Sequence, residues 1–211
     1  MDDDRLAWIY SATSPEELRE RYEVWAAEYD RDLAGMGWRA PAAAAARCHH
    51  FAGSTASVLD AGCGTGLVGQ HLKALGVGRL VGFDLSPAML AQAASRGVYD
   101  ELRQGSLLEP LPFEPGSFDA VVSVGVFTLG HVGPAGLAGL PAAVRLGGHV
   151  TMTFRDDTVE ALGHGDELRR LESSGVWQLV ERTEPAAMIV EDGEPAAMRV
   201  STWLVTGRLP A

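Results

Sequence analysis

The feature that most restricts the fold of this chain is a glycine-rich turn between an apolar strand and a helix. Residues 57–61 are mostly apolar and of strand length, residues 62–66 read Gly-Cys-Gly-Thr-Gly, and residues 67–75 have helical spacing. Glycines let the chain turn tightly and let the backbone approach a ligand closely. The positive end of the following helix favours an anionic or polar ligand. Alone, the turn permits a dinucleotide, S-adenosyl-L-methionine (SAM) or no ligand.

The residues around this turn alternate between strands and helices. A strand, a crossover helix and a second strand in this order form a parallel pair, so the chain is predicted to be α/β with a mostly parallel sheet. The predicted strands are 57–61, 79–84, 101–104, 118–124 and 148–154, and the predicted helices are 67–75, 86–96, 134–144 and 158–174.

The N-terminal quarter precedes this alternation and is predicted to be helical. Ser14-Pro15-Glu16-Glu17 is a capping box with proline at the first helical position. Apolar residues then recur at helical spacing as far as Gly35, and a second helix is expected over 42–51. We therefore expect residues 1–52 to form a helical lid over a core of residues 53–211, within one compact unit.

The C-terminal part also departs from the alternation. Residues 176–182 and 199–206 are both strand-like, and no good helix lies between them. Asp192-Gly193 in the connection is a hairpin turn signal. The pattern predicts an antiparallel C-terminal hairpin that closes one edge of the sheet.

Two carboxylates beside the glycine-rich turn narrow the choice of ligand. Asp84 ends the second strand, 22 residues after Gly62, and can accept hydrogen bonds from both ribose hydroxyls of either NAD or SAM. Asp60 lies two residues before Gly62, where it would repel a diphosphate but suit the sulfonium or ammonium of SAM. The sequence therefore favours SAM over NAD. The interpretation that Asp60 only caps the turn through backbone N–H groups stays open.

As an ordered set, these motifs resemble those of class I SAM-dependent methyltransferases. The set comprises Leu59–Gly66, Asp84, Phe118–Ser123 and Arg145–Gly148, and the similarity covers roughly residues 57–154. The resemblance implies a Rossmann-like fold with a seven-stranded sheet whose last strand is reversed. It also implies SAM as the methyl donor and S-adenosyl-L-homocysteine (SAH) as the product.

The same resemblance assigns roles to individual residues around the cofactor. Many family members carry an acidic residue after the third strand that binds the adenine amino group, and this chain has Ser106, followed by Leu107, near that position. The hydroxyl of Ser106 or the backbone would accept that hydrogen bond instead. By resemblance, Asp60, Gly62 and Gly64 would face the methionine part, Asp84 the ribose, and Leu85 and Met89 the adenine. Ser123, the first residue of a segment that follows the fourth strand, is expected to line the site of transfer.

The flanking segments resemble a narrower group. Residues 22–32, 38–41 and 127–132 are similar to those of the Williams–Beuren syndrome critical region methyltransferase-like proteins. In such enzymes the N-terminal helices cover the cofactor, which makes Tyr29 and Trp38 candidates for contacts between the lid and the cofactor. The alternative, that both rings only pack the lid on the core, stays open.

Methyl transfer from a sulfonium needs positioning and exclusion of water, and needs a base only if the acceptor must lose a proton. His131, a few residues past the fourth strand, is the candidate general base. A structural histidine at the edge of the core is the competing interpretation. Residues 123–126 lack the Asn-Pro-Pro-Tyr and Pro-Cys signatures of enzymes that methylate nucleic-acid bases.

The composition indicates which classes of partner the protein can bind. The net charge is −11 and Lys73 is the only lysine, so no basic patch for phosphates is visible. A small-molecule acceptor is therefore expected and nucleic acid is not; a protein or RNA methyltransferase and a non-catalytic SAM-binding protein are the alternatives. Cys48 and Cys63 lack metal-ligand spacing, so no metal is expected.

The sequence also bears on localisation. No apolar run approaches the roughly 18 residues that a membrane span needs, and the Met-Asp-Asp-Asp start is unlike a signal peptide. We expect a cytoplasmic protein with no membrane partner, and the sequence leaves the oligomeric state open.

Overall fold

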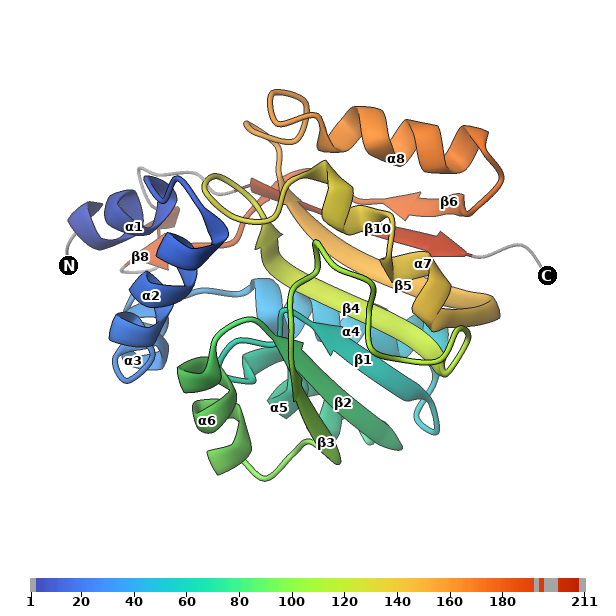
Figure 1. Cartoon of the computed structure of the whole chain (residues 1–211), viewed down its shortest axis with the longest axis horizontal. Coiled ribbons are helices and arrows are strands. Elements are labelled where there is room, and N and C mark those ends of the chain that lie inside the picture. The colour runs from blue at the N-terminus through green and yellow to red at the C-terminus, as the bar shows by residue number, and fades with distance from the viewer. Residues whose placement is uncertain (1–2, 192–193, 196–200, 209–211) are drawn as a thin grey trace.

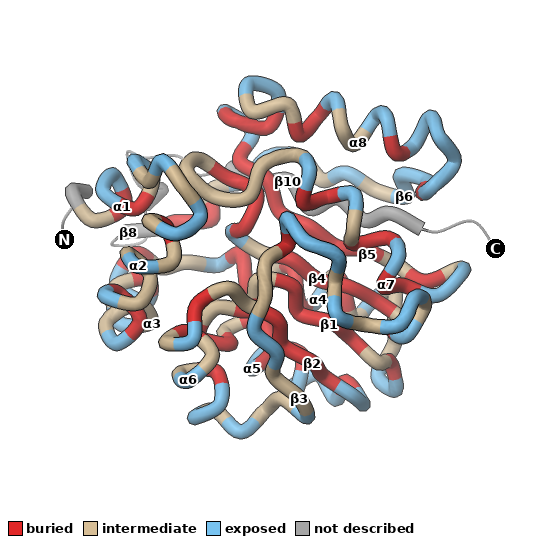
Figure 2. The backbone as a smooth tube through the Cα atoms, viewed as in Figure 1, coloured by how far each residue is buried: buried red, intermediate tan, exposed pale blue. Residues whose placement is uncertain are grey.

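A single large sheet runs through the centre of the molecule (Figure 1). The computed structural model describes residues 3–191, 194–195 and 201–208. The strand order is β3-β2-β1-β4-β5-β10-β6, and the short strand β7 pairs with β10. In Figure 2 the central strands are largely buried, whereas β3 at one edge is partly exposed.

Five of these strands are parallel, as the sequence predicts. Helices lie in the connections from β1 to β2, from β2 to β3 and from β4 to β5, whereas residues 105–117 link β3 to β4 without a helix. Each strand returns in the same direction. Leu59 of β1 lies between Val81 of β2 and Val121 of β4, which places β1 at the middle of the parallel sheet. The strands are β1 (Ser57–Ala61), β2 (Arg79–Asp84), β3 (Glu101–Gln104), β4 (Phe118–Phe127) and β5 (Val144–Arg155).

Two helices cover one face of the parallel sheet. Helices α4 (Ala40–Ala52) and α5 (Leu67–Ala74) pack on each other, and α4 also packs on β4 and β5. Buried alanines of α4, with Val68 and Leu72 of α5, meet Val58 of β1 in one apolar cluster. Although α4 falls within the segment expected to form the lid, it is packed directly on the sheet.

Other helices cover the opposite face. Their apolar residues join a second cluster with Leu59, Val121 and Phe154 of the strands. The helix predicted for residues 158–174 begins later, after Gly163, whose φ of 77° interrupts the helical path. The elements are η1 (Pro134–Leu137), α7 (Leu140–Ala143) and α8 (His164–Ser173).

Three helices, α1 (Asp3–Tyr10), α2 (Pro15–Trp25) and α3 (Tyr29–Gly35), lie at one end of the sheet, and we call residues 3–35 the cover. The single helix predicted from Ser14 to Gly35 is broken at residues 26–28. The Trp25 and Tyr29 rings, on either side of this break, pack with their centroids 4.6 Å apart. The predicted cap is present, because the N–H of Glu17 donates to Oγ of Ser14. Helix α6 (Pro87–Ser95) packs against α2, β2 and β3.

The C-terminal strands extend the sheet beyond β5. Strand β10 (Ser201–Arg208) runs antiparallel between β5 and β6 (Gln178–Arg182). With β7 (Ala186–Ala187), the sheet has eight strands rather than the seven expected. Strands β8 (Val190–Glu191) and β9 (Glu194–Pro195) form a separate pair, and the predicted turn at Asp192-Gly193 lies outside the described residues.

No helix in the described parts of the chain is both long enough and apolar enough to cross a membrane.

Candidate functional site

A cavity of about 270 Å³ opens at the carboxyl ends of β1, β2 and β4. Ligands of open α/β sheets bind in this position, because the loops that follow the parallel strands meet there. One side of the cavity, which we call the floor, consists of residues 62–66, 84–86 and 105–107. The opposite side is formed by the connection between α1 and α2 and by the first part of α2 in the cover.

Most residues predicted to bind the cofactor lie around this cavity, although they come from separate loops. The lining includes the predicted residues Tyr29, Gly62, Gly64, Asp84, Leu85, Met89, Ser106 and Leu107, together with the candidate base His131. Three predicted residues, Trp38, Asp60 and Ser123, are not part of it.

The glycines of the turn are required by its geometry. Gly62 and Gly64 have φ values of 79° and 53°, which side chains rarely allow. A Cβ at Gly62 would come within 2.3 Å of Cγ2 of Val126, so the loop after β4 can approach only a glycine here. A Cβ at Gly64 would meet no protein atom within 4 Å, and it would enter the open cavity. The turn therefore leaves room for a ligand.

Asp84 ends β2 and joins the turn to the start of α6. Its Oδ2 accepts the N–H of Gly64 at 2.7 Å, and its Oδ1 accepts the N–H of Ser86 at 2.9 Å. Burial raises the pKa of Asp84, while the N–H donors of Ser86 and Gly64 act to lower it. A carboxylate offers about four lone-pair positions, so Asp84 can accept two further hydrogen bonds from ligand hydroxyls.

Asp60 lies on the other side of β1 from the cavity. Successive side chains of a strand point to opposite faces, and Asp60 shares the face of Val58, beneath α4 and α5. It is fully buried, and its Oδ2 accepts the hydroxyl of Tyr99 at 2.7 Å. Burial raises the pKa of Asp60 to about 7. The structure therefore does not bring this carboxylate to the position expected for the methionine part of SAM.

Ser123 and Trp38 are also turned away from the cavity. Ser123 is fully buried in β4, where its hydroxyl donates to the carbonyl oxygen of Ala61 at 2.7 Å. Trp38 packs in the apolar cluster of the cover and lines a second, smaller cavity. Their surroundings fit structural roles, one as a link between β4 and β1 and the other as a packing residue.

His131 lines the cavity and is in direct contact with the cover. Its Nδ1 is 2.6 Å from the carbonyl oxygen of Leu129, which can only accept, so Nδ1 carries the proton. Nε2 then accepts a hydrogen bond from the hydroxyl of Tyr22. Burial lowers the pKa of His131 to about 4, so the imidazole is neutral at pH 7 and its free lone pair is already engaged.

The sequence did not identify the part of the cover that lines the cavity. It consists of the connection before α2 and the inner side of that helix. The capping box fixed where α2 begins, but no local signal told which face would point to the cavity. The residues are Ala12, Thr13, Ser14, Pro15, Leu18, Arg19 and Tyr22.

A group of polar contacts ties the cover to the floor. Oγ1 of Thr65, within the glycine-rich turn, donates to Oδ1 of Asp30 in α3 at 2.5 Å. Arg96, which caps the end of α6, forms an ion pair with Asp30 and donates from Nε to the carbonyl oxygen of Thr65 at 2.6 Å. The turn and the cover are therefore held in one arrangement.

The lining fits SAM in shape and in chemistry. The space above Gly64 admits a ligand close to the backbone, and Asp84 supplies acceptors for hydroxyl groups. Leu85 and Met89 give an apolar surface for a flat base. Among the residues that the structure describes, no group of three histidine, cysteine or acidic side chains is arranged to hold a metal ion.

Comparison with known sequences agrees with this geometry. Residues 58–148 match the family described as methyltransferase domain. Human methyltransferase-like protein 27, of the Williams–Beuren region, is 39% identical over 166 residues, which cover 74% of this chain and 66% of that protein. The 18S rRNA (guanine-N(7))-methyltransferase of Bos taurus is 46% identical over 67 residues, which cover 32% of this chain and 24% of that protein. The chain thus spans just under two thirds of the human relative and about a quarter of the bovine one.

A solved structure shows the same fold. A chain from the complex of the Haloferax volcanii Trm112 methyltransferase activator with a methyltransferase superposes with a TM-score of 0.68. The alignment covers 90% of this chain and 98% of that chain, at 21% identity.

Proposed function

The chain belongs to the family of SAM-dependent methyltransferases, whose cofactor is SAM, and we propose that it methylates a small molecule enclosed between the floor and the cover. The observation that carries this proposal is the cavity itself, because donors and acceptors for SAM line one side of it and the helices of the cover line the other. Bound SAM would supply a methyl group on a positively charged sulfur, with SAH as the product.

The floor would hold the cofactor. Asp84 would accept hydrogen bonds from the ribose hydroxyls, Leu85 and Met89 would pack on the adenine, and Ser106 with Leu107 would border its edge. Gly62 and Gly64 would let the methionine part lie against the backbone. The motif resemblance implies these roles, and the positions of the residues around one cavity support them.

Asp60 would act on the cofactor indirectly. The hydroxyl of Tyr99 donates a hydrogen bond to Asp60, which fixes the Tyr99 ring. A Cβ added at Gly66 or at Gly69 would lie within 3 Å of this ring. This ring therefore packs beneath the turn and the start of α5. In this proposal Asp60 is a positioning residue for the turn, not a contact of the sulfonium.

The cover would act as the lid. Residues between Ala12 and Tyr29 of the cover border the cavity, whereas α4 is packed on the sheet, so the lid would be shorter than the predicted segment 1–52. Tyr22 and Tyr29 line the cavity from this side. By excluding water, the lid would strengthen electrostatic interactions between the site and the developing charges.

The transfer step would be an in-line displacement. The lone pair of the acceptor forms the bond to the methyl carbon while the carbon–sulfur bond breaks and its electron pair stays on sulfur. An acceptor O–H or N–H group also loses its proton, to water or to a neutral side chain. His131 would orient the Tyr22 hydroxyl, since a pKa of about 4 makes it a weak base.

Two other acceptor classes remain as alternatives. The relatives include an rRNA methyltransferase, which favours RNA as the second candidate, but the net charge of −11 disfavours binding to phosphates. A protein acceptor would have to reach a cavity that α2 borders. A small molecule needs neither a basic surface nor an open groove.

The cofactor claim is tested by calorimetric titration with SAM, SAH and NAD. We expect SAM and SAH to bind and NAD not to bind. Failure of both SAM and SAH at millimolar concentration would overturn the claim, and tight NAD binding would replace it.

The acceptor claim is tested with methyl-labelled SAM. Label should pass to members of a small-molecule panel and not to ribosomal RNA or to a protein extract. Transfer to RNA alone would establish the second candidate, and binding of SAM without transfer to any acceptor would favour a non-catalytic SAM-binding protein.

A further inference from the structure

A second cavity of about 60 Å³ lies behind the first, between the cover and the ends of β4 and β5. Figure 1 shows β4 pointing toward this end of the molecule, where α1 and α2 lie. Tyr22, Tyr29, Gly125 and His131 line both cavities. These four residues therefore form the partition between the cofactor cavity and the second one.

Aromatic rings form most of the wall on the side of the cover. Tyr22 packs against Trp25 with ring centroids 6.0 Å apart, and Trp25 packs against Tyr29 at 4.6 Å. Tyr22 also meets His131 at 5.4 Å, in an edge-on arrangement. Tyr10 and Trp38 complete this aromatic wall.

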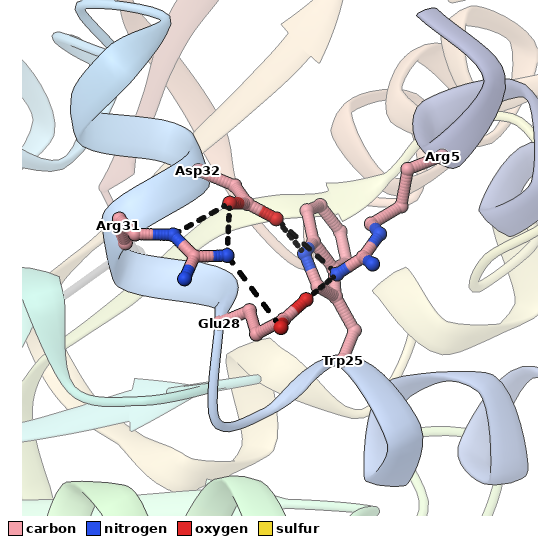
Figure 3. Close-up of polar contacts among 5 residues, drawn as sticks. All are labelled: Arg5, Trp25, Glu28, Arg31 and Asp32. Atoms are coloured by element: carbon pink, nitrogen blue, oxygen red, sulfur yellow. Dashed lines mark hydrogen bonds and ion pairs between the residues drawn. The ribbon is translucent and has the colours of Figure 1, made fainter. Parts of the chain in front are cut away.

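The wall is held in place from behind by polar contacts (Figure 3). Nε1 of Trp25 donates to Oδ2 of Asp32 at 2.8 Å. Arg5 and Arg31 both contact the carboxylate of Asp32. The indole therefore keeps one orientation, which preorganises the cavity for a ligand.

One polar group of the cavity lining has no partner. Thr128, directly after β4, is 8% exposed, and its buried Oγ1 has no hydrogen-bond partner in the structure. A buried hydroxyl without a hydrogen bond destabilises the folded protein. A ligand in the second cavity would remove this cost by donating to, or accepting from, Thr128.

The lining carries one charged side chain, and that charge is compensated. Arg155 forms two hydrogen bonds with Asp157, at 3.0 and 2.6 Å, and its guanidinium lies 5.3 Å from the centre of the Tyr10 ring. Because Asp157 compensates Arg155, the lining offers no uncompensated charge to pair with an anionic or a cationic ligand. The cavity therefore favours an uncharged ligand.

We propose that this second cavity is the acceptor subsite and that it binds a single uncharged six-membered aromatic ring. The inference rests on the proposed methyl-transfer function. A water needs about 10–15 Å³ by this measure of volume, so the cavity holds roughly four to six non-hydrogen atoms. One six-membered ring approaches that limit and a fused bicyclic base exceeds it.

The position of Gly125 connects the subsite to the chemistry. A Cβ at Gly125 would meet no atom within 4 Å, and Gly125 lines both cavities. A hydroxyl or amino substituent of the ring can therefore extend past Gly125 toward the cofactor cavity. The ring itself packs offset-stacked or edge-to-face on the aromatic wall.

The test measures binding of phenol to the complex of the full chain with SAH, by ligand-observed NMR, for wild type, Thr128→Val and Thr151→Val. Thr151 is the matched control, because it is also a fully buried threonine whose Oγ1 has no partner, and it lines neither cavity. We expect Thr128→Val to weaken phenol binding about fivefold, the size of one hydrogen bond. Thr151→Val should leave it unchanged, and both variants should keep the wild-type affinity for SAH.

Benzylammonium and guanosine serve as the charged and the bicyclic probes, and neither should bind in the second cavity. Equal phenol affinity in all three proteins, or tighter binding of either other probe, would overturn the inference. If SAH itself fails to bind the wild type, the proposed function fails first; if SAH binds and phenol does not, only the acceptor subsite is wrong. A thermal melt of each variant shows that the proteins compared are folded.

Discussion

The floor and the cover of the cavity are stabilised by different interactions. In the floor, Asp84 accepts N–H groups from Gly64 and Ser86, so short hydrogen bonds to the backbone fix the loops. In the cover, Trp25 and Tyr29 pack ring against ring, and ion pairs such as Arg5 with Glu28 lie near the surface. Exposed ion pairs contribute little to stability, so the cover depends mainly on a few large side chains.

This difference implies that the two sides have different local stabilities. The floor follows directly from strands at the centre of the sheet, whereas the cover is joined to the rest through an apolar cluster, the packing of α2 on α6 and a few polar contacts such as those of Asp30 and Tyr22. Segments with fewer buried contacts open at lower free energy than core strands. The cover should therefore open without unfolding the floor.

Removal of the central ring of the cover should have the largest effect. Trp25 is 1% exposed, and Trp25→Ala should lower the free energy of unfolding by about 3–5 kcal/mol. Amides of α2 and α3 should lose protection from hydrogen exchange, while those of β1 and β2 keep theirs. Trp8→Ala, at a ring 38% exposed in the same cover, is the control and should have a small effect. Equal loss of protection in the strands would show that floor and cover open together.

The buried carboxylate beneath the floor should make stability depend on pH. The pKa of Asp60 is about 7 in the native state and about 3.9 when unfolded. Between these values the native state binds a proton that the unfolded state releases, so the stability falls as pH rises and levels off above about 7. From pH 5 to 8, wild type should lose about 2–3 kcal/mol relative to Asp60→Asn.

Chemical denaturation at each pH measures this loss. Asp119→Asn is the control, because hydrogen bonds from Ser57 and Arg145 lower the pKa of Asp119. Its contribution is present above the unfolded pKa and disappears only as pH falls below that value, so it should be constant from pH 5 to 8. Parallel curves for wild type and Asp60→Asn would show that Asp60 is charged in the native state throughout this range.

Replacement of Asp84 in the floor should weaken cofactor binding more than it disturbs the fold. Asp84→Ala removes the proposed acceptor of the ribose hydroxyls and should weaken SAM binding by about 1–3 kcal/mol. Titration calorimetry gives this value, and hydrogen exchange should show the cover unchanged. Asp157→Ala is the control, since Asp157 lies outside the lining of both cavities. Unchanged affinity for SAM would contradict the ribose assignment.

Weakening the contact between the cover and the floor at Asp30 should have the smallest effect. Asp30→Asn keeps an acceptor for Thr65 but removes the charge that pairs with Arg96. A partly exposed pair of this kind contributes about 1 kcal/mol or less, so SAH affinity should fall about fivefold at most. The affinity of Asp30→Asn should respond less to added salt than that of wild type. Glu28→Gln, which removes an ion pair elsewhere in the cover, should not change SAH affinity.

The floor was largely predictable from the sequence, because its signals are local. The glycine-rich turn, the carboxylate at the end of β2 and the Ser86-Pro87 helix start each occupy a few consecutive residues. Asp60 and Ser123 were placed differently by the structure, and strand alternation accounts for both. Asp60 shares a face with Val58, and Ser123 points to the backbone of Ala61. Motif position along the chain did not reveal which face each side chain would occupy.

The sequence predicts that the cover is helical, but it does not predict how the helices of the cover are arranged around the cavity. Its shape depends on contacts between residues far apart in the sequence, such as Tyr22 with His131 and Asp30 with Thr65. Residues 26–28, where the helix is broken, are Ala-Ala-Glu and contain neither proline nor glycine, so no local signal marks the break. The same long-range packing creates the second cavity, for which no short motif exists.

The contact of Asp30 with Thr65 also bears on the rate of turnover. The turn that would lie against the cofactor is the turn that holds the cover, so opening of the cover at this point requires this contact to separate. Lid opening limits the turnover of many enzymes. If it does so here, each cycle lasts as long as the closed cover persists. The strength of one ion pair and one hydrogen bond would then set how fast product leaves, even where it hardly changes how tightly the product binds.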